Sequence, residues 1–259
     1  MLRPRIIPCL LIHDKGLVKT TKFSDPVYVG DPLNAVKIFN EKEADEIVIL
    51  DIDCSSKNRR PDMKLLEQLA LECRMPMCYG GGIKTVEQAK DIISLGIEKI
   101  AISSAAIENP RLVSDIANAI GNQSVVVVLD VKKKSFSSSY EVWTYNGKKN
   151  TKISPLEFSK QLEEFGVGEI VINSIENDGM MKGFNLDLVN EIYNSVNVPL
   201  TVLGGAGSLD DIKAVVDKFG IIGVAAGSLF VFKGKLKAVL INYPSVEFKD
   251  SLVDSRKSL

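Results

Sequence analysis

The second half of this chain repeats the first at a nearly constant spacing. The matching segments, which lie 123 or 124 positions apart, are Leu50–Asp53 with Asn173–Glu176, Tyr79–Ile83 with Leu203–Gly207, and Ile102–Ala105 with Ala226–Leu229. A period of this kind indicates one structural unit that is used twice. The fold is therefore expected to consist of two equivalent halves, and a site in one half should have a counterpart in the other.

Short apolar runs alternate with amphipathic segments along the whole chain. The runs are continuously apolar, which indicates strands buried on both faces, as in a parallel sheet. We expect eight strands, at Ile6–Leu11, Glu46–Asp51, Met75–Tyr79, Lys99–Ser103, Ser124–Asp130, Glu169–Asn173, Leu200–Leu203 and Gly223–Ala226. Capping residues before proline in Asp31-Pro32, Asn109-Pro110 and Ser154-Pro155 predict the starts of intervening helices. Four strand–helix units in each half predict an α/β fold, a closed (βα)8 TIM barrel with a two-fold half-barrel repeat.

Three segments depart from the bare repeat. Leu11–Asp31 is expected to be a long loop after the first strand. Tyr140–Tyr145 alternates and is followed by Asn146-Gly147, which predicts a small hairpin after the fifth strand. The charged tail from Pro244 onward is expected to be partly disordered. The barrel is accordingly assigned to residues 1–243 and the C-terminal tail to residues 244–259.

The composition is that of an ordinary globular protein. The 259 residues are 45% hydrophobic, and 32 basic against 33 acidic residues leave a net charge of −1, so nothing favours a nucleic acid or a membrane as a partner. The apolar runs are far shorter than the ~20 residues of a membrane helix. The N-terminus lacks the apolar core of a signal peptide, so a cytoplasmic location is expected. Four cysteines without metal-ligand spacing and a single histidine predict free thiols, no metal site and no cofactor.

Each half carries a glycine-rich turn after its third strand and a small-residue turn after its fourth. Glycine lets the backbone approach a ligand closely, and N–H groups at a helix start point at an anion. Two adjacent turns of this kind form a phosphate cradle in many such barrels. A single pair could equally be a tight chain reversal, but two equivalent pairs favour two phosphate sites. The predicted phosphate-binding residues are Gly81, Gly82, Ser103, Ser104, Asp178, Gly179, Gly204, Gly205, Gly227 and Ser228.

Residues at the C-terminal ends of barrel strands are natural catalytic candidates. Asp130 ends the apolar strand Val125–Leu129, so its carboxylate should reach the barrel mouth; a solvated strand-end aspartate is the alternative. Lys19 lies in the long first loop, where a mobile cation could cover an anionic substrate, although a solvated loop lysine fits equally well. His13 could transfer protons, but a lone loop histidine is more often incidental.

These motifs together resemble the cyclase subunit of imidazole glycerol phosphate synthase, HisF, from about Arg5 to about Phe232. The resemblance is carried by Arg5–Leu10, Gly30–Pro32, Tyr79–Ile83, Thr144–Thr151, Asn177–Gly179 and Gly204–Gly207. It implies a barrel that receives ammonia from a glutaminase subunit docked at its N-terminal face. The ammonia is used on a bisphosphorylated substrate at the C-terminal face, giving imidazole glycerol phosphate and an aminoimidazole carboxamide ribotide.

The resemblance also implies a gate for ammonia, formed by Arg5, Glu46, Lys99 and Glu169. Each of these residues stands at the N-terminal end of an expected strand, where no substrate chemistry is expected. Without the resemblance, a ring of alternating charges at the bottom of a barrel would be interpreted as a stabilising salt-bridge network. The resemblance favours a gate and a docked partner.

One position departs from the family pattern in a way that bears on chemistry. The family's two acid–base aspartates, one per half-barrel, correspond here to Leu11 and Asp130, and the repeat also aligns these two positions. Leucine transfers no proton, and the loss of one positioned acid–base group typically costs ~10²–10⁴-fold in rate. Ser103 replaces the family's usual asparagine, and Asp53 stands where the family has a small hydroxyl residue.

Three functions are open at this point. In the first, the chain is a cyclase of histidine biosynthesis in which Asp14, Asp53 or His13 takes over the missing role. In the second, the barrel passes ammonia to another acceptor, as in diverged relatives of the glycosyl amidation-associated (WbuZ-like) type, which work with a glutaminase-like partner and a sugar amidotransferase in surface-polysaccharide pathways. In the third, the chain is a non-catalytic phosphate-binding scaffold or ammonia conduit. Loss of one aspartate with retention of the gate favours the second.

Overall fold

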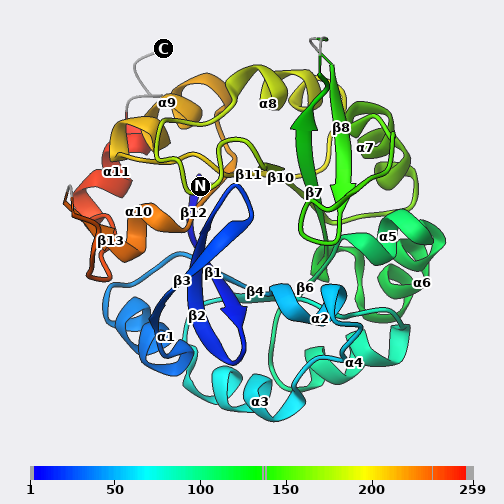
Figure 1. The fold of residues 1–259 in the computed structure, drawn as a ribbon, viewed down its shortest axis with the longest axis horizontal. Coiled ribbons are helices and arrows are strands. Elements are labelled where there is room, and N and C mark those ends of the chain that lie inside the picture. The colour runs from blue at the N-terminus through cyan, green and yellow to red at the C-terminus, as the bar shows by residue number, and fades with distance from the viewer. Residues whose placement is uncertain (1–2, 136, 138, 235, 255–259) are drawn as a thin grey trace.

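The computed structural model describes residues 3–135, 137, 139–234 and 236–254. In this part of the chain, parallel strands close into a barrel around which helices form an outer ring (Figure 1). The strands follow each other around the barrel in the order β1 (Arg5–His13), β4 (Ile47–Asp51), β5 (Met77–Gly80), β6 (Lys99–Ile102), β7 (Val125–Lys133), β10 (Glu169–Ser174), β11 (Leu200–Leu203) and β12 (Gly223–Ala226), and β12 pairs again with β1. The predicted (βα)8 barrel is confirmed.

The helices cover the outside of the barrel and begin where local capping favours them. They are α1 (Pro32–Glu41), α2 (Ile52–Ser56), α3 (Met63–Glu72), α4 (Val86–Ser94), α5 (Ser104–Glu108), α6 (Arg111–Ile120), the short 3₁₀ helix η1 (Asn122–Ser124), α7 (Pro155–Glu164), α8 (Leu186–Tyr193), α9 (Leu209–Phe219), α10 (Ser228–Val231) and α11 (Val246–Asp254). The predicted caps Asp31 and Ser154 accept backbone N–H groups of the first turns of α1 and α7. The predicted cap Asn109 is wrong, because this residue ends α5 and α6 starts after Pro110 instead.

The first strand of each half-barrel runs on into an antiparallel extension. β1 pairs with β2 (Gly16–Thr21), which pairs with β3 (Ser24–Gly30), and these strands cross the middle of the barrel mouth in Figure 1. The expected loop over Leu11–Asp31 is therefore wrong. β7 pairs in the same way with β8 (Tyr140–Thr144) and β8 with β9 (Lys149–Asn150), which confirms the predicted hairpin. A small hairpin of β13 (Phe232–Lys233) and β14 (Ala238–Val239) follows α10.

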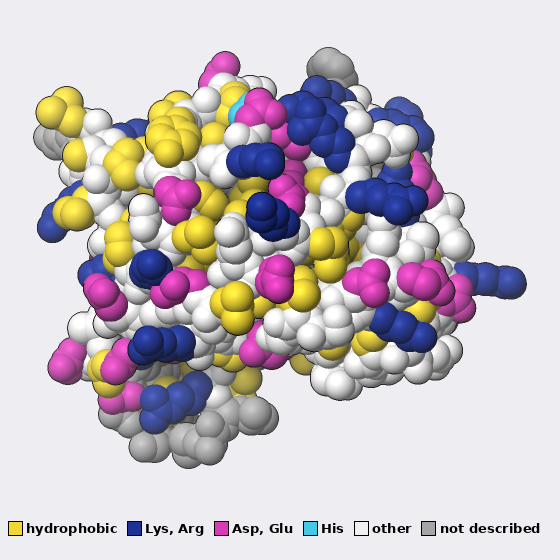
Figure 2. Space-filling model, turned by 90° about the horizontal axis from the view of Figure 1, so that it is seen from below, with side chains coloured by type: hydrophobic (Ala, Val, Ile, Leu, Met, Phe, Trp, Pro, Cys, Tyr) yellow, Lys and Arg dark blue, Asp and Glu magenta, His cyan; other side chains and the backbone are white. Residues whose placement is uncertain are grey.

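The C-terminal segment forms a helix up to Asp254, while the part of the tail at residues 255–259, on which the expectation of partial disorder also falls, lies outside the described residues. α11 buries Leu252, which is 1% exposed, and Lys249 on the same helix pairs with Asp45 at 2.9 Å. These contacts fix a segment whose composition alone suggested a loose tail. Among the described residues, no helix combines the length and apolarity needed to cross a bilayer. Acidic and basic side chains are interspersed over the side of the barrel shown in Figure 2, as the near-zero net charge predicts.

The inside of the barrel is divided into layers because alternate side chains of each strand point toward the barrel axis. An apolar cluster fills the middle and is separate from the larger core between the strands and the helices. Its buried members are Ile7, Cys9, Val48, Cys78, Ala101, Val126, Val128, Val171, Leu203 and Ala225. A charged layer lies at the N-terminal ends of the strands and a cavity at their C-terminal ends, so the apolar cluster separates the two.

Candidate active site

A large cavity opens at the C-terminal ends of the barrel strands. It encloses roughly 1400 Å³, including the part that is open to solvent. Asp130, Lys19 and Leu11 line it. So do all the residues predicted to bind phosphate, namely Gly81, Gly82, Ser103, Ser104, Asp178, Gly179, Gly204, Gly205, Gly227 and Ser228. The structure therefore brings the motifs of both half-barrels to one space.

The glycine turns have no room for a larger residue. Gly205 has φ +125°, and a Cβ atom built on it would lie 2.1 Å from the backbone oxygen of Gly183. Helices α5 and α10 open at matching positions of the two halves, and neither has a side-chain cap on its first turn. Their first N–H groups are therefore not occupied by a capping side chain, as two anion sites would require.

Asp130 is the central titratable group of the cavity. Burial raises its pKa to about 7, and the hydrogen bond that Asn173 Nδ2 donates to Asp130 Oδ1 at 2.9 Å opposes this rise only in part. A carboxyl group whose pKa is close to neutral can both donate and accept a proton under physiological conditions. Asp130 therefore has the protonation behaviour expected of a general acid–base residue.

The raised pKa of Asp130 predicts a pH-dependent loss of stability. Because the folded-state pKa lies above the unfolded value, the folded state binds more protons between about pH 4 and pH 7, and stability falls as the pH rises through this window. Asp130→Asn should remove this cost and raise the free energy of unfolding at pH 8 by roughly 2–4 kcal/mol. The free energies of unfolding of the wild type and the variant would be measured by urea denaturation at pH 4 and pH 8. The exposed Asp115→Asn is the control, and equal pH dependence in both variants would contradict the prediction.

Lys19 occupies a fixed and buried position, not a mobile loop. It lies on β2 with 5% of its surface exposed, and its ammonium group donates a hydrogen bond to the backbone oxygen of Cys9. The expectation of a mobile cation is wrong, because the hairpin of β2 and β3 packs this side chain into the barrel mouth. Burial lowers the pKa of Lys19. Asp178 lies close enough to act electrostatically on Lys19, and an anionic ligand in the cavity would add to this countercharge.

Leu11 lies where a second acid–base residue would be needed. It is on β1, and Asp130 is on β7, four strands away around the barrel, so the two side chains line the cavity from opposite walls. Leu50 on β4 is the direct partner of Leu11 in the sheet register and also lines the cavity. The wall opposite Asp130 is therefore apolar.

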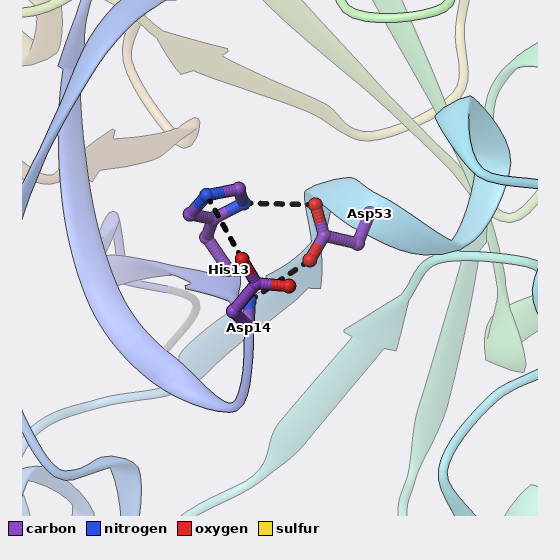
Figure 3. Close-up of side chains that lie close together, drawn as sticks. All are labelled: His13, Asp14 and Asp53. Atoms are coloured by element: carbon purple, nitrogen blue, oxygen red, sulfur yellow. Dashed lines mark hydrogen bonds and ion pairs between the residues drawn. The ribbon is translucent and has the colours of Figure 1, made fainter.

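The residues considered as replacements for the missing aspartate lie together, but outside the cavity lining. His13 Nδ1 is 2.8 Å from Asp53 Oδ1, and Asp53 Oδ2 accepts the backbone N–H of Asp14 at 2.8 Å (Figure 3). Lys57 binds both carboxylates, at 2.9 Å from Asp14 and 3.0 Å from Asp53. Burial opposes the charge of Asp53, but the N–H of Asp14 and the ammonium of Lys57 lower its pKa to about 2.

This cluster ties the turn between β1 and β2 to helix α2. Its ligand atoms lie close enough together to hold a cation. However, the ammonium of Lys57 already forms ion pairs with both carboxylates. The geometry thus assigns the cluster a structural role in holding the first hairpin.

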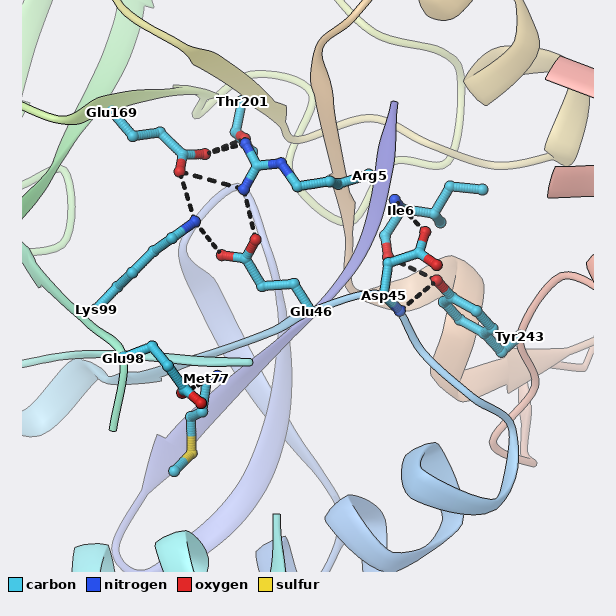
Figure 4. Close-up of polar contacts among 10 residues, drawn as sticks. All are labelled: Arg5, Ile6, Asp45, Glu46, Met77, Glu98, Lys99, Glu169, Thr201 and Tyr243. Carbon is cyan, nitrogen blue, oxygen red and sulfur yellow. Dashed lines mark hydrogen bonds and ion pairs between the residues drawn. The ribbon is translucent and has the colours of Figure 1, made fainter. Parts of the chain in front are cut away.

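The four residues expected to form a gate make a closed ring at the opposite end of the barrel (Figure 4). Arg5 donates to Glu46 and, at 2.8 Å, to Glu169. Lys99 Nζ lies 2.9 Å from each of the same two glutamates. Burial opposes the charges, but the paired groups raise the pKa of Arg5 and Lys99 and lower that of Glu169. These shifts favour the charged forms of Arg5, Lys99 and Glu169, and Thr201 donates one more hydrogen bond to Glu169.

Some residues of the cavity were not singled out from the sequence. Asn173 holds Asp130, Thr20 donates to Asp178 at 2.8 Å, and Leu203 adds to the apolar lining. The repeat did contain a signal for Asn173, because this residue aligns with Leu50 in the first half. A polar residue at a position that is apolar in the other half is a candidate for a function particular to one half.

Comparison with known proteins matches this sequence to one family. The family model described as "Histidine biosynthesis protein" matches residues 5–237. The chain belongs to the HisF family. It is 57% identical over 254 residues, 98% of both chains, to a Vibrio vulnificus protein provisionally named imidazole glycerol phosphate synthase subunit hisF3.

More distant members of the HisF family show the same full-length similarity. A Pseudomonas aeruginosa protein provisionally named imidazole glycerol phosphate synthase subunit hisF2 is 52% identical over 96% of this chain and 99% of its own length. The imidazole glycerol phosphate synthase subunit HisF of Lactococcus lactis subsp. cremoris (strain SK11) is 40% identical over 89% of both chains. The chain is therefore more similar to the provisionally named relatives than to this HisF.

Proposed function

We propose that this chain is a HisF-type subunit that accepts ammonia from a glutaminase partner and supplies it to an acceptor other than the cyclase substrate. The proposal rests on two observations. Leu11, which cannot transfer a proton, lies on the cavity wall opposite Asp130, and the charged ring is intact. The names of the relatives, which refer to imidazole glycerol phosphate synthase, support the ammonia-using part. The glutaminase would dock at the N-terminal face, below the ring.

The phosphate cradles support an anionic acceptor for the ammonia. Two glycine turns and two uncapped helix starts surround the cavity, and Lys19 adds a buried amine whose protonated form an anionic ligand would favour. We therefore propose a phosphorylated small molecule as the ligand. A sugar that becomes amidated for surface-polysaccharide biosynthesis, with a sugar amidotransferase as a further partner, is the acceptor class that fits a diverged HisF.

The cyclase of histidine biosynthesis is the second candidate. Asp130 and Lys19 favour it, since both line the cavity and the pKa of Asp130 is raised to about 7. Against it, the side chains that could replace the missing aspartate lie outside the cavity lining. Asp53 is held by three partners and Asp14 by Lys57, so neither is free to act on a substrate.

Isotope delivery tests whether ammonia passes through the barrel. The chain and a glutaminase from the same genome would be supplied with amide-¹⁵N glutamine, excess ¹⁴N ammonium chloride and a deproteinised metabolite extract. Mass spectrometry of the aminated products should show more ¹⁵N than the bulk ammonium pool contains. In Lys99→Ala, two buried glutamates lose a shared partner and the ring is disrupted, so the ¹⁵N fraction should fall toward the bulk value.

The control for this experiment is Lys90→Ala, which changes an exposed lysine on α4. This variant should keep the ¹⁵N excess of the wild-type complex. The proposal is contradicted if the wild-type complex incorporates nitrogen at the bulk isotope ratio. It is also contradicted if Lys99→Ala retains the full excess, because the ring would then have no part in delivery.

A further inference from the structure

Two buried polar atoms of the cavity have no hydrogen-bond partner. They are Asn173 Oδ1 and Ser103 Oγ, the side-chain atoms of the described residues that are both inaccessible and unpaired. Asn173 is 5% exposed as a whole. A buried polar group without a partner costs free energy, so such atoms are rare in folded proteins and call for an explanation. Both residues line the cavity, which places a ligand among the explanations.

The unpaired atoms flank Asp130 on the two neighbouring strands. Asn173 is on β10 and directly opposite Asp130 of β7 in the register, while Ser103 follows β6, which pairs with β7 on its other side. The leucines at positions 11 and 50 of β1 and β4 line the same cavity. Asn173, Asp130 and Ser103 thus lie together on three adjacent strands, and the apolar side chains of Leu11 and Leu50 line the cavity from other strands.

The same strands lead from the charged ring to these atoms. On β10, the inward residues in order are Glu169 of the ring, Val171 of the apolar cluster and Asn173. On β6 they are Lys99 and Ala101, followed by Ser103 just beyond the end of the strand. A small molecule that crosses the apolar cluster from the ring therefore meets these polar side chains as it reaches the cavity.

We propose that Asn173, Ser103 and Asp130 form a subsite that binds ammonia, as NH₃ or NH₄⁺, where it leaves the apolar interior. This subsite rests on the proposed function, because it assumes that ammonia reaches the cavity. Asn173 Oδ1 and Ser103 Oγ each accept one N–H, and the Asp130 carboxylate accepts a third. Space for the ligand beside Asn173 depends on Gly204, since a Cβ atom there would lie 2.9 Å from Oδ1.

The subsite also accounts for the activation of ammonium as a nucleophile. One N–H bond of ammonium breaks, its electron pair stays on nitrogen, and the proton forms an O–H bond with ionised Asp130. The products are neutral ammonia and a protonated carboxyl group, so charge and atoms balance. Asn173 acts here as a positioning residue, because it holds Asp130 through Nδ2 and the nitrogen ligand through Oδ1.

Ammonium binding to the isolated chain tests this proposal. Aspartate carboxyl carbons would be labelled with ¹³C, and the Asp130 signal identified by its absence in Asp130→Asn. Titration with ammonium chloride at pH 8 should shift this signal saturably, whereas sodium or potassium chloride should not. In Asn173→Leu the apparent dissociation constant should rise at least ~10-fold, because a hydrogen bond to a charged group is lost. Ser103→Ala should weaken binding by a smaller factor.

Ser55→Ala provides the matched control, since Ser55 lines the same cavity away from the proposed subsite. It should bind ammonium like the wild type. Ser103→Ala removes a single oxygen, so it keeps the test decisive if Asn173→Leu does not fold. The proposal is overturned if potassium produces the same shift as ammonium, if ammonium produces none, or if neither variant weakens binding.

The titration needs neither a glutaminase nor an acceptor, so it separates this proposal from the proposed function. Without ammonium binding, Asn173 Oδ1 would have a simpler explanation: the amide turns and accepts the proton of neutral Asp130. The absence of ammonium binding would contradict the subsite but would not contradict the delivery of glutamine nitrogen through the barrel. Ammonium binding without isotope delivery would contradict the proposed function alone.

Discussion

Leu11→Asp is expected to raise ammonium-dependent turnover of the bisphosphorylated ribulosyl substrate of the HisF cyclase by ~10²–10⁴-fold over the wild-type chain. The reason is that Asp130 and the predicted phosphate-binding residues already surround the cavity, while the opposite wall at Leu11 is apolar. The new carboxylate would restore one acid–base group in each half-barrel. Purified protein at pH 8 with excess ammonium chloride would be assayed by following substrate disappearance optically.

Leu50→Asp is the matched control for this gain. Leu50 is the register partner of Leu11 and lines the same cavity. The substitution Leu50→Asp therefore introduces the same carboxylate on the neighbouring strand. It should give no comparable increase, and Asp130→Asn should abolish the gain in the Leu11→Asp background. The opposite result would be a wild-type chain as fast as an ordinary cyclase and inactivated by Asp130→Asn. In that case Leu11 would not impair cyclase turnover, and the chain would be a cyclase.

The fold was predictable because it depends on patterns that the sequence repeats. Eight apolar runs located the strands, and the half-barrel repeat predicted which loops would meet. The loop predicted over Leu11–Asp31 is wrong because the composition of this segment alone does not reveal its antiparallel strands, whereas its counterpart in the second half does. The segment after β7 was already expected to form a hairpin, and the same repeat would have placed one after β1, where β2 and β3 lie.

The candidate site was predictable as a set of positions, but the state of each side chain was not. Motifs identified Asp130 and Lys19, yet the burial of Lys19 depends on a hairpin folding over the barrel mouth. The pKa of Asp130 depends on desolvation, which requires the packed structure. Likewise, the pairing of Asp53 with His13 and Lys57 joins residues from β1 and α2, and no local pattern connects them.

Arg5→Ala is expected to lower the free energy of unfolding by ~3–5 kcal/mol at pH 7, because it breaks a buried ion network on one side. Glu46 and Glu169, which are 4% and 5% exposed, would be left to share Lys99 as their cation. The lowered pKa of Glu169 sets the sign of the pH dependence: the stabilisation is present at neutral pH and is lost as Glu169 becomes protonated in acid. The difference in the free energy of unfolding between wild type and variant should therefore shrink from pH 7 to pH 3, as measured by urea denaturation.

Lys213→Ala is the control for this prediction. It breaks an exposed ion pair with Asp217 on α9 and should lower the free energy of unfolding by less than ~1 kcal/mol. If Arg5→Ala costs no more than Lys213→Ala, the ring adds nothing to stability, and ammonia passage would be the one role left for its charges.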